Sequence, residues 1–257
     1  MSGPAEKRLK GGNTTPVARR GPDVLREAGP WTGTVQKLLN HLRDSGVDWC
    51  PEPRGWHADG RETLSYLKGK VPTYPLPEWV YDEAVLVTAA RWLRELHDLT
   101  VGFDKPEYTW RAARHQPVEV ICHNDFAPYN MVFKDHQLTG VIDWDFASPG
   151  PRIWDLSYLA YRMVPLVGPY NPDAPKTPKD LMARLRLLRD TYGSDASTTD
   201  ILRTVVARLD DLADFTRGQA KRTKNPEFLD QVAAYESDAE FLRTLILPEP
   251  PVGAAKA

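Results

Sequence analysis

A polar loop between two apolar runs decides the fold, and it reads Val120-Ile121-Cys122-His123-Asn124-Asp125-Phe126-Ala127-Pro128-Tyr129-Asn130-Met131-Val132-Phe133. Short apolar runs of this kind are typical of buried strands, so the loop between them is presented at a surface or a cleft. Asp125 can accept or orient the proton of an attacking hydroxyl, and the amide oxygen of Asn130 can hold Mg²⁺ without adding charge. The loop is therefore suited to general-base and metal-ligand chemistry.

A second motif lies downstream, where a mainly apolar run over residues 138–142 ends in Asp143. A strand that ends in a carboxylate delivers it to the edge of a cleft, where it can bind a metal that bridges phosphates. Asp145 lies two residues further on and would face the same side of an extended segment. Mg²⁺ is usually held by one or two protein carboxylates with phosphate and water, so Asn130 and Asp143 are sufficient ligands and Asp145 is an additional candidate.

Taken singly, these residues have ordinary explanations. Asp125 and Asn130 are residue types common in turns, and Asp143 could simply end a strand. His123, which follows an apolar run, is best explained as a hydrogen-bonded structural histidine. Their joint order favours a functional loop, because Asp125 and Asn130 have the spacing of the kinase catalytic loop H-R-D-x-x-x-x-N.

Composition describes an ordinary globular protein. The 257 residues are 41% hydrophobic and 26% charged, which suits one large domain or two lobes. Two cysteines, Cys50 and Cys122, exclude a disulfide framework and a four-cysteine zinc site, and they favour a reducing compartment. No apolar run approaches the length of a membrane span and no signal-peptide core is present, so we expect a soluble, cytoplasmic protein without a membrane partner.

Charge is distributed unevenly along the chain. Residues 1–70 carry 12 basic and 8 acidic side chains, whereas the remainder carries 21 basic and 27 acidic ones. This division suits an anionic ligand held between a basic and an acidic part. A dedicated nucleic-acid binder would show a stronger basic patch, so nucleic acid is not an expected partner.

Hydrophobic patterning predicts two unequal lobes and an α+β fold class. Residues 1–70 should form a small β-rich N-lobe with one helix, including a hairpin around Gly21-Pro22-Asp23 and a helix that begins at an N-cap Thr32. Residues 71–257 should form a larger, mainly helical C-lobe, with a linker at residues 68–77. The helices are expected at residues 79–97, 154–161, 181–192, 201–219 and 227–245.

The sequence resembles the aminoglycoside phosphotransferase family, a branch of the kinase-like fold that also holds choline and macrolide kinases. The resemblance is carried by the pattern His123-Asn124-Asp125-(x4)-Asn130, by Val141-Ile142-Asp143-Trp144 and by Gly150-Pro151-(x3)-Asp155-Leu156. It implies a protein-kinase-like, two-lobed fold with the active site between the lobes.

The resemblance also implies a role for each matching residue. Asp125 would be the catalytic base or hydroxyl-orienting residue, and Asn130 and Asp143 would be the magnesium ligands on the triphosphate. His123 would brace the metal-binding loop. Asp155 would accept hydrogen bonds that hold the catalytic loop, although a carboxylate favoured by a helix N-terminus explains it equally well.

The predicted N-lobe matches the family only loosely. Ser65-Tyr66-Leu67 resembles the hinge whose backbone meets the nucleotide base, and an ordinary strand end explains it almost as well. No G-x-G-x-x-G motif is present, so Gly12 and Asn13, in the sequence Gly11-Gly12-Asn13-Thr14, are the candidates for a phosphate-covering turn. A plain entry into a hairpin is the alternative for that segment.

The basic residue on the phosphates also departs from the family pattern. There is no V-A-I-K lysine, and Arg26 falls where the family places its phosphate-contacting residue. Arg19 and Arg20 compete for this role, and a solvated surface charge is the alternative for Arg26. The helix over residues 34–43 lacks the glutamate of the usual Lys–Glu pair, which is therefore absent or rebuilt.

These observations predict a Mg²⁺-dependent phosphotransferase that moves the γ-phosphoryl group of ATP or GTP to an alcohol group. The acceptor would be an aminoglycoside-like or other small hydroxyl-bearing metabolite, and the protein would act as a monomer or homodimer. A non-catalytic nucleotide-binding regulator on the same fold is the main alternative. A metal-dependent hydrolase built on His123, Asp125 and Asp143 is less favoured, because such sites usually need more ligands.

The acceptor is not identified by the sequence. Asp210, Asp211 and Asp214 form the best acidic cluster for a polycation, but a charge run on a helix is usually a solvated face. Trp110, Trp154 and Tyr158 could line an acceptor pocket, although core packing is the favoured explanation for them.

Overall fold

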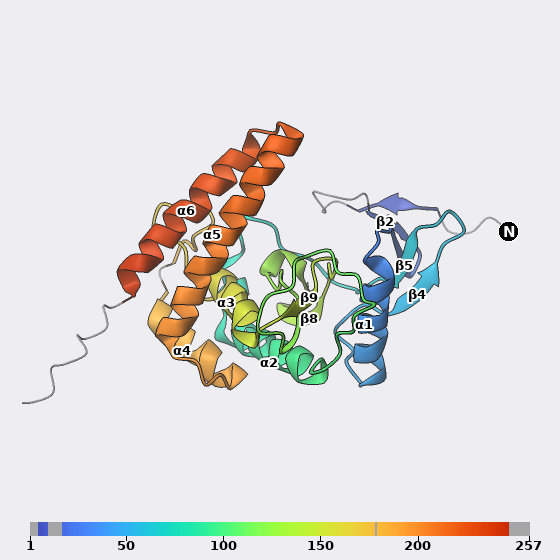
Figure 1. Ribbon diagram of the computed structural model, residues 1–257, viewed down its shortest axis with the longest axis horizontal. Coiled ribbons are helices and arrows are strands. Elements are labelled where there is room, and N and C mark those ends of the chain that lie inside the picture. The colour runs from blue at the N-terminus through green and yellow to red at the C-terminus, as the bar shows by residue number, and fades with distance from the viewer. Residues whose placement is uncertain (1–4, 10–16, 178, 247–257) are drawn as a thin grey trace, which may run out of the picture.

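A small sheet at one end and a set of helices at the other form the two parts of the molecule (Figure 1). The computed structural model describes residues 5–9, 17–177 and 179–246. The predicted phosphate-covering residues Gly12 and Asn13 lie outside these ranges.

The N-terminal sheet is antiparallel, with strand order β1-β2-β3-β5-β4. Its strands are β1 (Lys7–Arg8), β2 (Val17–Arg20), β3 (Asp23–Arg26), β4 (Pro53–Trp56) and β5 (Glu62–Ser65). The predicted hairpin is confirmed, since β2 and β3 pair around Gly21. Gly21 has a φ of 62°, a left-handed conformation that glycine adopts at little steric cost. The register of β3 on β5 places Arg26 opposite Glu62.

Helix α1 (Thr32–Asp44) packs its apolar face into the core, as its periodicity predicts. Its residues Val35, Leu38, Leu39 and Leu42 recur at helical spacing, and none is more than 1% exposed. The predicted N-cap at Thr32 is wrong, because Trp31 holds the cap position and Thr32 is already helical. The Thr32 hydroxyl instead accepts a hydrogen bond from the Gly29 N–H at 2.8 Å, which fixes the turn that enters the helix.

The helix predicted over residues 79–97 is two helices. A 3₁₀ helix, η1 (Glu78–Tyr81), precedes α2 (Glu83–Leu99), and Asp82 between them is extended, with a ψ of 143°. An extended residue ends one run of helical hydrogen bonds and begins the next, so the continuous apolar pattern did not reveal the break.

Among its described residues, the C-terminal part combines two small sheets with α2 and four further α-helices. Strand β6 (Val120–Cys122) pairs with β9 (Ser148–Gly150), and β7 (Met131–Lys134) pairs with β8 (Gln137–Val141). The four further helices are α3 (Arg152–Met163), α4 (Leu181–Tyr192), α5 (Thr198–Thr223) and α6 (Glu227–Leu245), close to the predicted ranges. Helices α5 and α6 lie side by side as the long pair in Figure 1.

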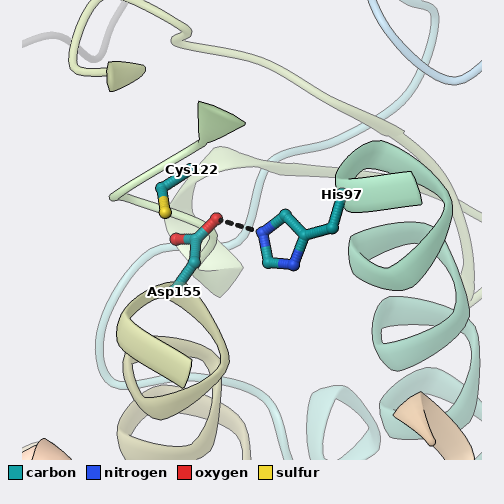
Figure 2. Close-up of side chains that lie close together, drawn as sticks. All are labelled: His97, Cys122 and Asp155. Carbon is teal, nitrogen blue, oxygen red and sulfur yellow. Dashed lines mark hydrogen bonds and ion pairs between the residues drawn. The ribbon is translucent and has the colours of Figure 1, made fainter. Parts of the chain in front are cut away.

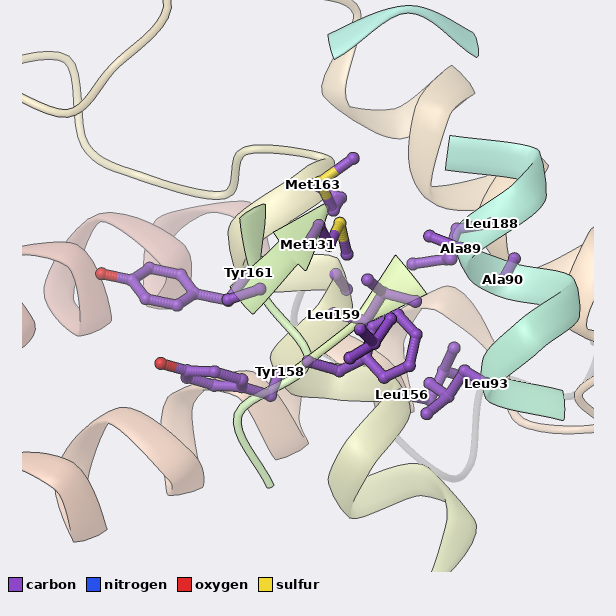
Figure 3. Packing of buried hydrophobic residues seen from close by; sticks show 14 of the residues in the cluster. Ala89, Ala90, Leu93, Met131, Leu156, Tyr158, Leu159, Tyr161, Met163 and Leu188 are labelled. Carbon is purple, nitrogen blue, oxygen red and sulfur yellow. The ribbon is translucent and has the colours of Figure 1, made fainter. Parts of the chain in front are cut away.

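One hydrophobic cluster runs through both parts of the molecule. Figure 3 shows its centre, where Ala89, Ala90 and Leu93 of α2 face α3. From the N-terminal side, Trp49 stacks on Trp92 with ring centroids 5.0 Å apart. The Trp49 carbonyl also accepts a hydrogen bond from the Val141 N–H at 2.8 Å, next to the segment that carries Asp143. The junction between the parts is therefore packed as core.

Among the described residues, no helix is both long and apolar enough to cross a membrane.

Candidate active site

The loop between β6 and β7 carries the predicted catalytic residues. It turns sharply at Asn124, whose φ of 65° is left-handed, a conformation that asparagine tolerates better than most residues. The Asn124 side chain donates to the Phe146 carbonyl at 2.9 Å and to the Ser148 hydroxyl at 2.8 Å. The loop ends in the 3₁₀ turn η2 (Pro128–Asn130), directly before β7.

Asp125 and Asn130 lie side by side. The Asp125 carboxylate accepts a hydrogen bond on Oδ2 from Asn130 Nδ2 at 2.8 Å, and one on Oδ1 from the Tyr129 hydroxyl at 2.5 Å. Burial and the nearby Asp125 charge raise the pKa of Tyr129 well above its ordinary value, so Tyr129 keeps the proton that it donates. In the described part of the chain, the Asn130 amide bonds Asp125 through nitrogen only, which leaves its oxygen available to a metal.

Asp143 and Asp145 meet at Arg26, although not as an extended segment would place them. Asp143 has a left-handed φ of 61°, so the expectation of an extended segment is wrong. Arg26 still lies close to both carboxylates, 2.6 Å from Asp145 and 3.6 Å from Asp143. Partial burial raises the pKa of Asp143 to about 6, an effect that Arg26 opposes and that the other two site aspartates increase.

The donor chemistry of this cluster fits Mg²⁺. The amide oxygen of Asn130 and the partly exposed carboxylate of Asp143 are hard oxygen ligands of the kind that Mg²⁺ prefers. Asp145 is less available, since it is paired with Arg26 and lies 3.5 Å from Arg111.

Arg26 has an acidic partner that the sequence reading missed. Its Nη2 lies 2.7 Å from Oε2 of Glu62, which is fully buried on β5. Gln36 of α1, at the helix position where no glutamate was found, lies 3.4 Å from the other Glu62 oxygen. The Lys–Glu pair of the family pattern is therefore rebuilt as an Arg–Glu pair between adjacent strands.

The two competing arginines point elsewhere. The Arg19 guanidinium stacks on the Tyr66 ring, 3.8 Å from its centroid, and Arg20 lies 2.9 Å from the His57 ring nitrogen. Of the three, Arg26 alone is described in contact with the carboxylates of the site.

Two of the three backbone N–H groups of the predicted hinge are hydrogen-bonded within the N-terminal part. The Ser65 N–H donates to the Glu52 carbonyl at 2.9 Å, and the Tyr66 N–H donates to the Pro22 carbonyl at 2.8 Å. These two donors are therefore not available to a nucleotide base. Leu67 is the remaining candidate, and its side chain packs close to Gly140, where an added Cβ would lie 2.6 Å from Leu67 Cδ1.

Asp155 lies beneath the catalytic loop, in the first turn of α3. Its carboxylate accepts hydrogen bonds from the backbone N–H groups of His123 at 2.6 Å and Asn124 at 2.9 Å. His97 adds a third contact at 3.2 Å (Figure 2). Its other ring nitrogen lies 2.6 Å from the Tyr192 hydroxyl. Burial alone would raise the pKa of Asp155, but the His97 hydrogen bond and nearby positive charge hold it below its ordinary value.

Cys122 completes a cluster with His97 and Asp155 whose potential ligand atoms lie within 4.8 Å of one another (Figure 2). Its thiol is 3.5 Å from the Pro151 carbonyl, and burial raises its pKa well above the ordinary value. The histidine and both carboxylate oxygens already have hydrogen-bond partners. We interpret the cluster as a buried brace rather than a metal centre.

His123 connects the catalytic loop to the segment that carries Asp143. Its Nε2 donates to the Ile142 carbonyl, and its Nδ1 accepts from the Asp125 N–H, both at 3.2 Å. Burial lowers its pKa, so the ring is neutral, as one donating and one accepting nitrogen require.

A second brace, Arg208 of α5, was not found in the sequence. It donates to the Asn124 carbonyl at 2.7 Å from 84 residues away along the chain. Its guanidinium also packs over the rings of Trp154 and Tyr158, at 4.7 and 4.6 Å. No local pattern marks such a residue, because its role depends only on how α5 docks.

A cavity of about 440 Å³ opens beside the catalytic loop. Trp110 and Trp154, two of the predicted acceptor-pocket residues, are not among the residues that line it. The third, Tyr158, does not line the cavity either, but its hydroxyl lies 2.6 Å from that of Tyr129, which does. Of the acidic cluster, Asp210 and Asp214 are exposed and ion-paired with arginines. The lining residues are Tyr74, Tyr129, Tyr161, Arg162, Asn171, Asp173, Gln231, Ala234 and Tyr235.

Several solved structures share this architecture. A choline/ethanolamine kinase family protein from Mesorhizobium loti is 15% identical, with a TM-score of 0.64 over 96% of this chain and 89% of that one. A Plasmodium vivax ethanolamine kinase is 10% identical, with a TM-score of 0.66 over 93% and 84%. The ADP-bound aminoglycoside phosphotransferase APH(2'')-Ib is 16% identical, with a TM-score of 0.59 over 94% and 95%. At such identities the likeness shows the fold alone.

Sequence comparisons establish the family. A trifolitoxin immunity protein of Rhizobium leguminosarum bv. trifolii is 40% identical over 148 residues, which are 55% of each chain, so the match spans about half of that relative. The model of the phosphotransferase enzyme family matches residues 18–188, well over half of the chain. The expected family and two-lobed fold are confirmed. The chain belongs to the phosphotransferase enzyme family and has its protein-kinase-like fold.

Proposed function

We propose that this phosphotransferase is a Mg²⁺-dependent small-molecule kinase that transfers the γ-phosphoryl group of ATP or GTP to an alcohol hydroxyl. The observation that carries the proposal is the placement of Asp125 within 2.8 Å of Asn130, beside a cavity large enough for a small acceptor. Phosphoryl transfer depends mainly on positioning and on neutralising charge, which these groups can supply.

Asp125 is the group that would orient the acceptor. Its Oδ1 already accepts a short hydrogen bond from a hydroxyl, that of Tyr129. An acceptor hydroxyl that replaces this partner would be held with its proton directed at the carboxylate and its oxygen free to attack. The carboxylate then takes the proton as the acceptor oxygen bonds to the γ-phosphorus and the bond from that phosphorus to the β-phosphate oxygen breaks, which releases ADP or GDP.

Asn130 and Asp143 would hold Mg²⁺, which would neutralise charge on the triphosphate when bound. Arg26 lies at the same cluster and is held by Glu62 on one side and Asp145 on the other. A guanidinium fixed in this way is suited to a bidentate phosphate contact. We assign to it the role that the absent lysine would have.

A non-catalytic nucleotide-binding regulator remains the alternative, supported by the two occupied N–H groups of the predicted hinge. The two proposals are separated by titrating ATP and Mg²⁺ in a thermal-shift assay while following ADP release with a panel of hydroxyl compounds. Acceptor-dependent ADP release supports the kinase. Nucleotide binding without ADP release above an acceptor-free control, for every compound, supports the regulator.

The 40% identical relative suggests a biological setting for the same chemistry, since its name describes immunity to a toxin. We propose immunity as a second candidate function, in which phosphorylation of a hydroxyl on a toxin or its target removes toxicity. Expression of the chain in a trifolitoxin-sensitive strain tests this candidate. Protection that requires Asp125 supports it, and unchanged sensitivity contradicts it.

A further inference from the structure

The cavity reaches the proposed catalytic carboxylate through one side chain. Tyr129 lines the cavity, and its hydroxyl lies 2.5 Å from Asp125 Oδ1. A volume of about 440 Å³ is in the range of small-molecule sites. A molecule bound here would therefore have one end beside Tyr129, one side chain away from Asp125.

Arg162 of α3 places a positive charge in the cavity wall. Its guanidinium lies 4.6 Å from the centroid of the Tyr161 ring and 5.6 Å from that of Tyr129, and its Nε is 3.4 Å from the Tyr158 hydroxyl. Within the described ranges it has no carboxylate at ion-pair distance, in contrast to Arg26, which has two close ones. Arginine stays charged in proteins, and a buried charge without a partner is costly.

Among the described residues, the remaining polar groups of the wall interact with this charge but form no ion pair with it, since Asp173 and Tyr74 are only its electrostatic and hydrogen-bonding neighbours. Asn171 is committed, because it donates to Asp238 at 2.7 Å and accepts from the Asp173 N–H at 2.8 Å. Asp173 is the acidic residue of the lining, and it forms no ion pair with Arg162 in the described structure. The other lining residues are mainly tyrosines, which offer flat apolar faces and hydroxyl groups.

We infer that the cavity binds an organic anion, with a carboxylate or phosphate group on Arg162 and a flat or apolar body among the tyrosines. Resting on the proposed kinase function, this organic anion would be the acceptor, with its hydroxyl toward Asp125. Arginine favours such groups because its planar fork can donate two parallel hydrogen bonds to them. A polycationic acceptor would instead meet a cation in the wall.

The test is a binding measurement without nucleotide, so it does not depend on kinase activity. The probes share a 4-hydroxyphenylethyl frame and differ in the attached group, which is a carboxylate, a phosphonate, a neutral carboxamide or an ammonium. Calorimetry or ligand-detected NMR gives the dissociation constant of each. We expect the carboxylate or the phosphonate to bind at least about tenfold more tightly than the carboxamide and the ammonium. The difference between the two anions shows which source of negative charge is preferred.

Two cavity variants with opposite expected effects complete the test. Arg162→Gln should abolish the preference for the anions, and Asp173→Asn should preserve or increase it, because it removes a negative group from the wall. Arg186→Gln, which changes an exposed arginine of α4, is the matched control and should bind like the wild type. The inference is overturned if neither anion binds at millimolar concentration, or if the neutral or cationic probe binds as tightly as the anions. It is also overturned if the preference for the anions survives in a folded Arg162→Gln. If that variant does not fold, a loss of the preference in Asp173→Asn overturns the inference.

The two experiments distinguish a failure of the inferred anion site from a failure of the proposed kinase function. Anion-selective binding without acceptor-dependent ADP release keeps the inferred anion site and removes the kinase. ADP release with an acceptor that lacks a negative charge keeps the kinase and removes the inferred acceptor class.

Discussion

Two polar regions contact the catalytic loop, one at His123 and Asn124 and one at Tyr129, and they differ in how completely their groups are paired. Beneath the catalytic loop, the brace of His97, Cys122 and Asp155 has hydrogen-bond partners for its histidine and both carboxylate oxygens. On the other side, the cavity presents Arg162 without a carboxylate partner among the described residues. Paired buried groups hold a structure in place, whereas an unpaired charge in a cavity wall points to a ligand.

The largest effect on stability should come from the brace. Asp155→Ala leaves two backbone N–H groups and His97 without their shared acceptor, so we expect the free energy of unfolding to fall by about 3–5 kcal/mol. Urea unfolding measures the change.

The matched control is Asp98→Ala, which removes an exposed carboxylate paired with Arg94 and Arg152 and should cost less than about 1 kcal/mol. If Asp155→Ala costs no more than the control, the brace does not hold the loop.

A smaller effect should appear as a dependence of stability on pH. Burial lowers the pKa of His123 below its ordinary value of 6.5, against the opposing charges of Asp155 and Asp125. Below pH 6.5 the unfolded chain therefore binds a proton at His123 that the folded chain does not, so this histidine lowers stability as the pH falls, by at most about 1.4 kcal/mol per pH unit. Asp143, whose pKa is raised to about 6, acts in the opposite direction, so the contribution of His123 is the difference between the slopes of the wild type and a His123→Gln variant. Urea unfolding of wild type and His123→Gln between pH 7 and 5 measures it. An equally steep slope in the variant would assign the dependence to other groups.

The smallest effect should come from the cavity. Arg162→Met replaces a cation that has no carboxylate partner among the described residues by an apolar side chain of similar length that can keep the packing on the tyrosine rings, so we expect the free energy of unfolding to change by less than about 1 kcal/mol in either direction. The melting temperature, measured without added anions, should remain close to that of the wild type. A loss as large as that of Asp155→Ala would show that Arg162 is a structural residue, and the contrast between the two regions would disappear.

Local sequence patterns predicted most of the fold. The hairpin at Gly21, the apolar face of α1 and the four C-terminal helices follow from turn chemistry and periodicity, which act over a few residues. The same is true of the loop that brings Asp125 and Asn130 together. The break at Asp82 was missed because an apolar pattern can continue across an extended residue.

The rest of the candidate site depends on contacts between distant segments. Glu62 meets Arg26 through strand pairing, and Arg208 reaches Asn124 from a helix 84 residues away. Arg162 stands out only after folding, which places it in a cavity wall with no carboxylate at ion-pair distance among the described residues. Sequence spacing cannot report such contacts, since they are set by how the helices dock.

The most direct test of the central claim is phosphoryl transfer by Asp125→Ala. With γ-labelled ATP, Mg²⁺ and an acceptor found in the panel, the wild type should label the acceptor. The variant should lose at least about a thousandfold in rate while its dissociation constant for ATP stays within about threefold of the wild-type value. Asp44→Ala, at the exposed end of α1, is the control and should keep the wild-type rate. Near-normal transfer by Asp125→Ala would contradict the proposed mechanism.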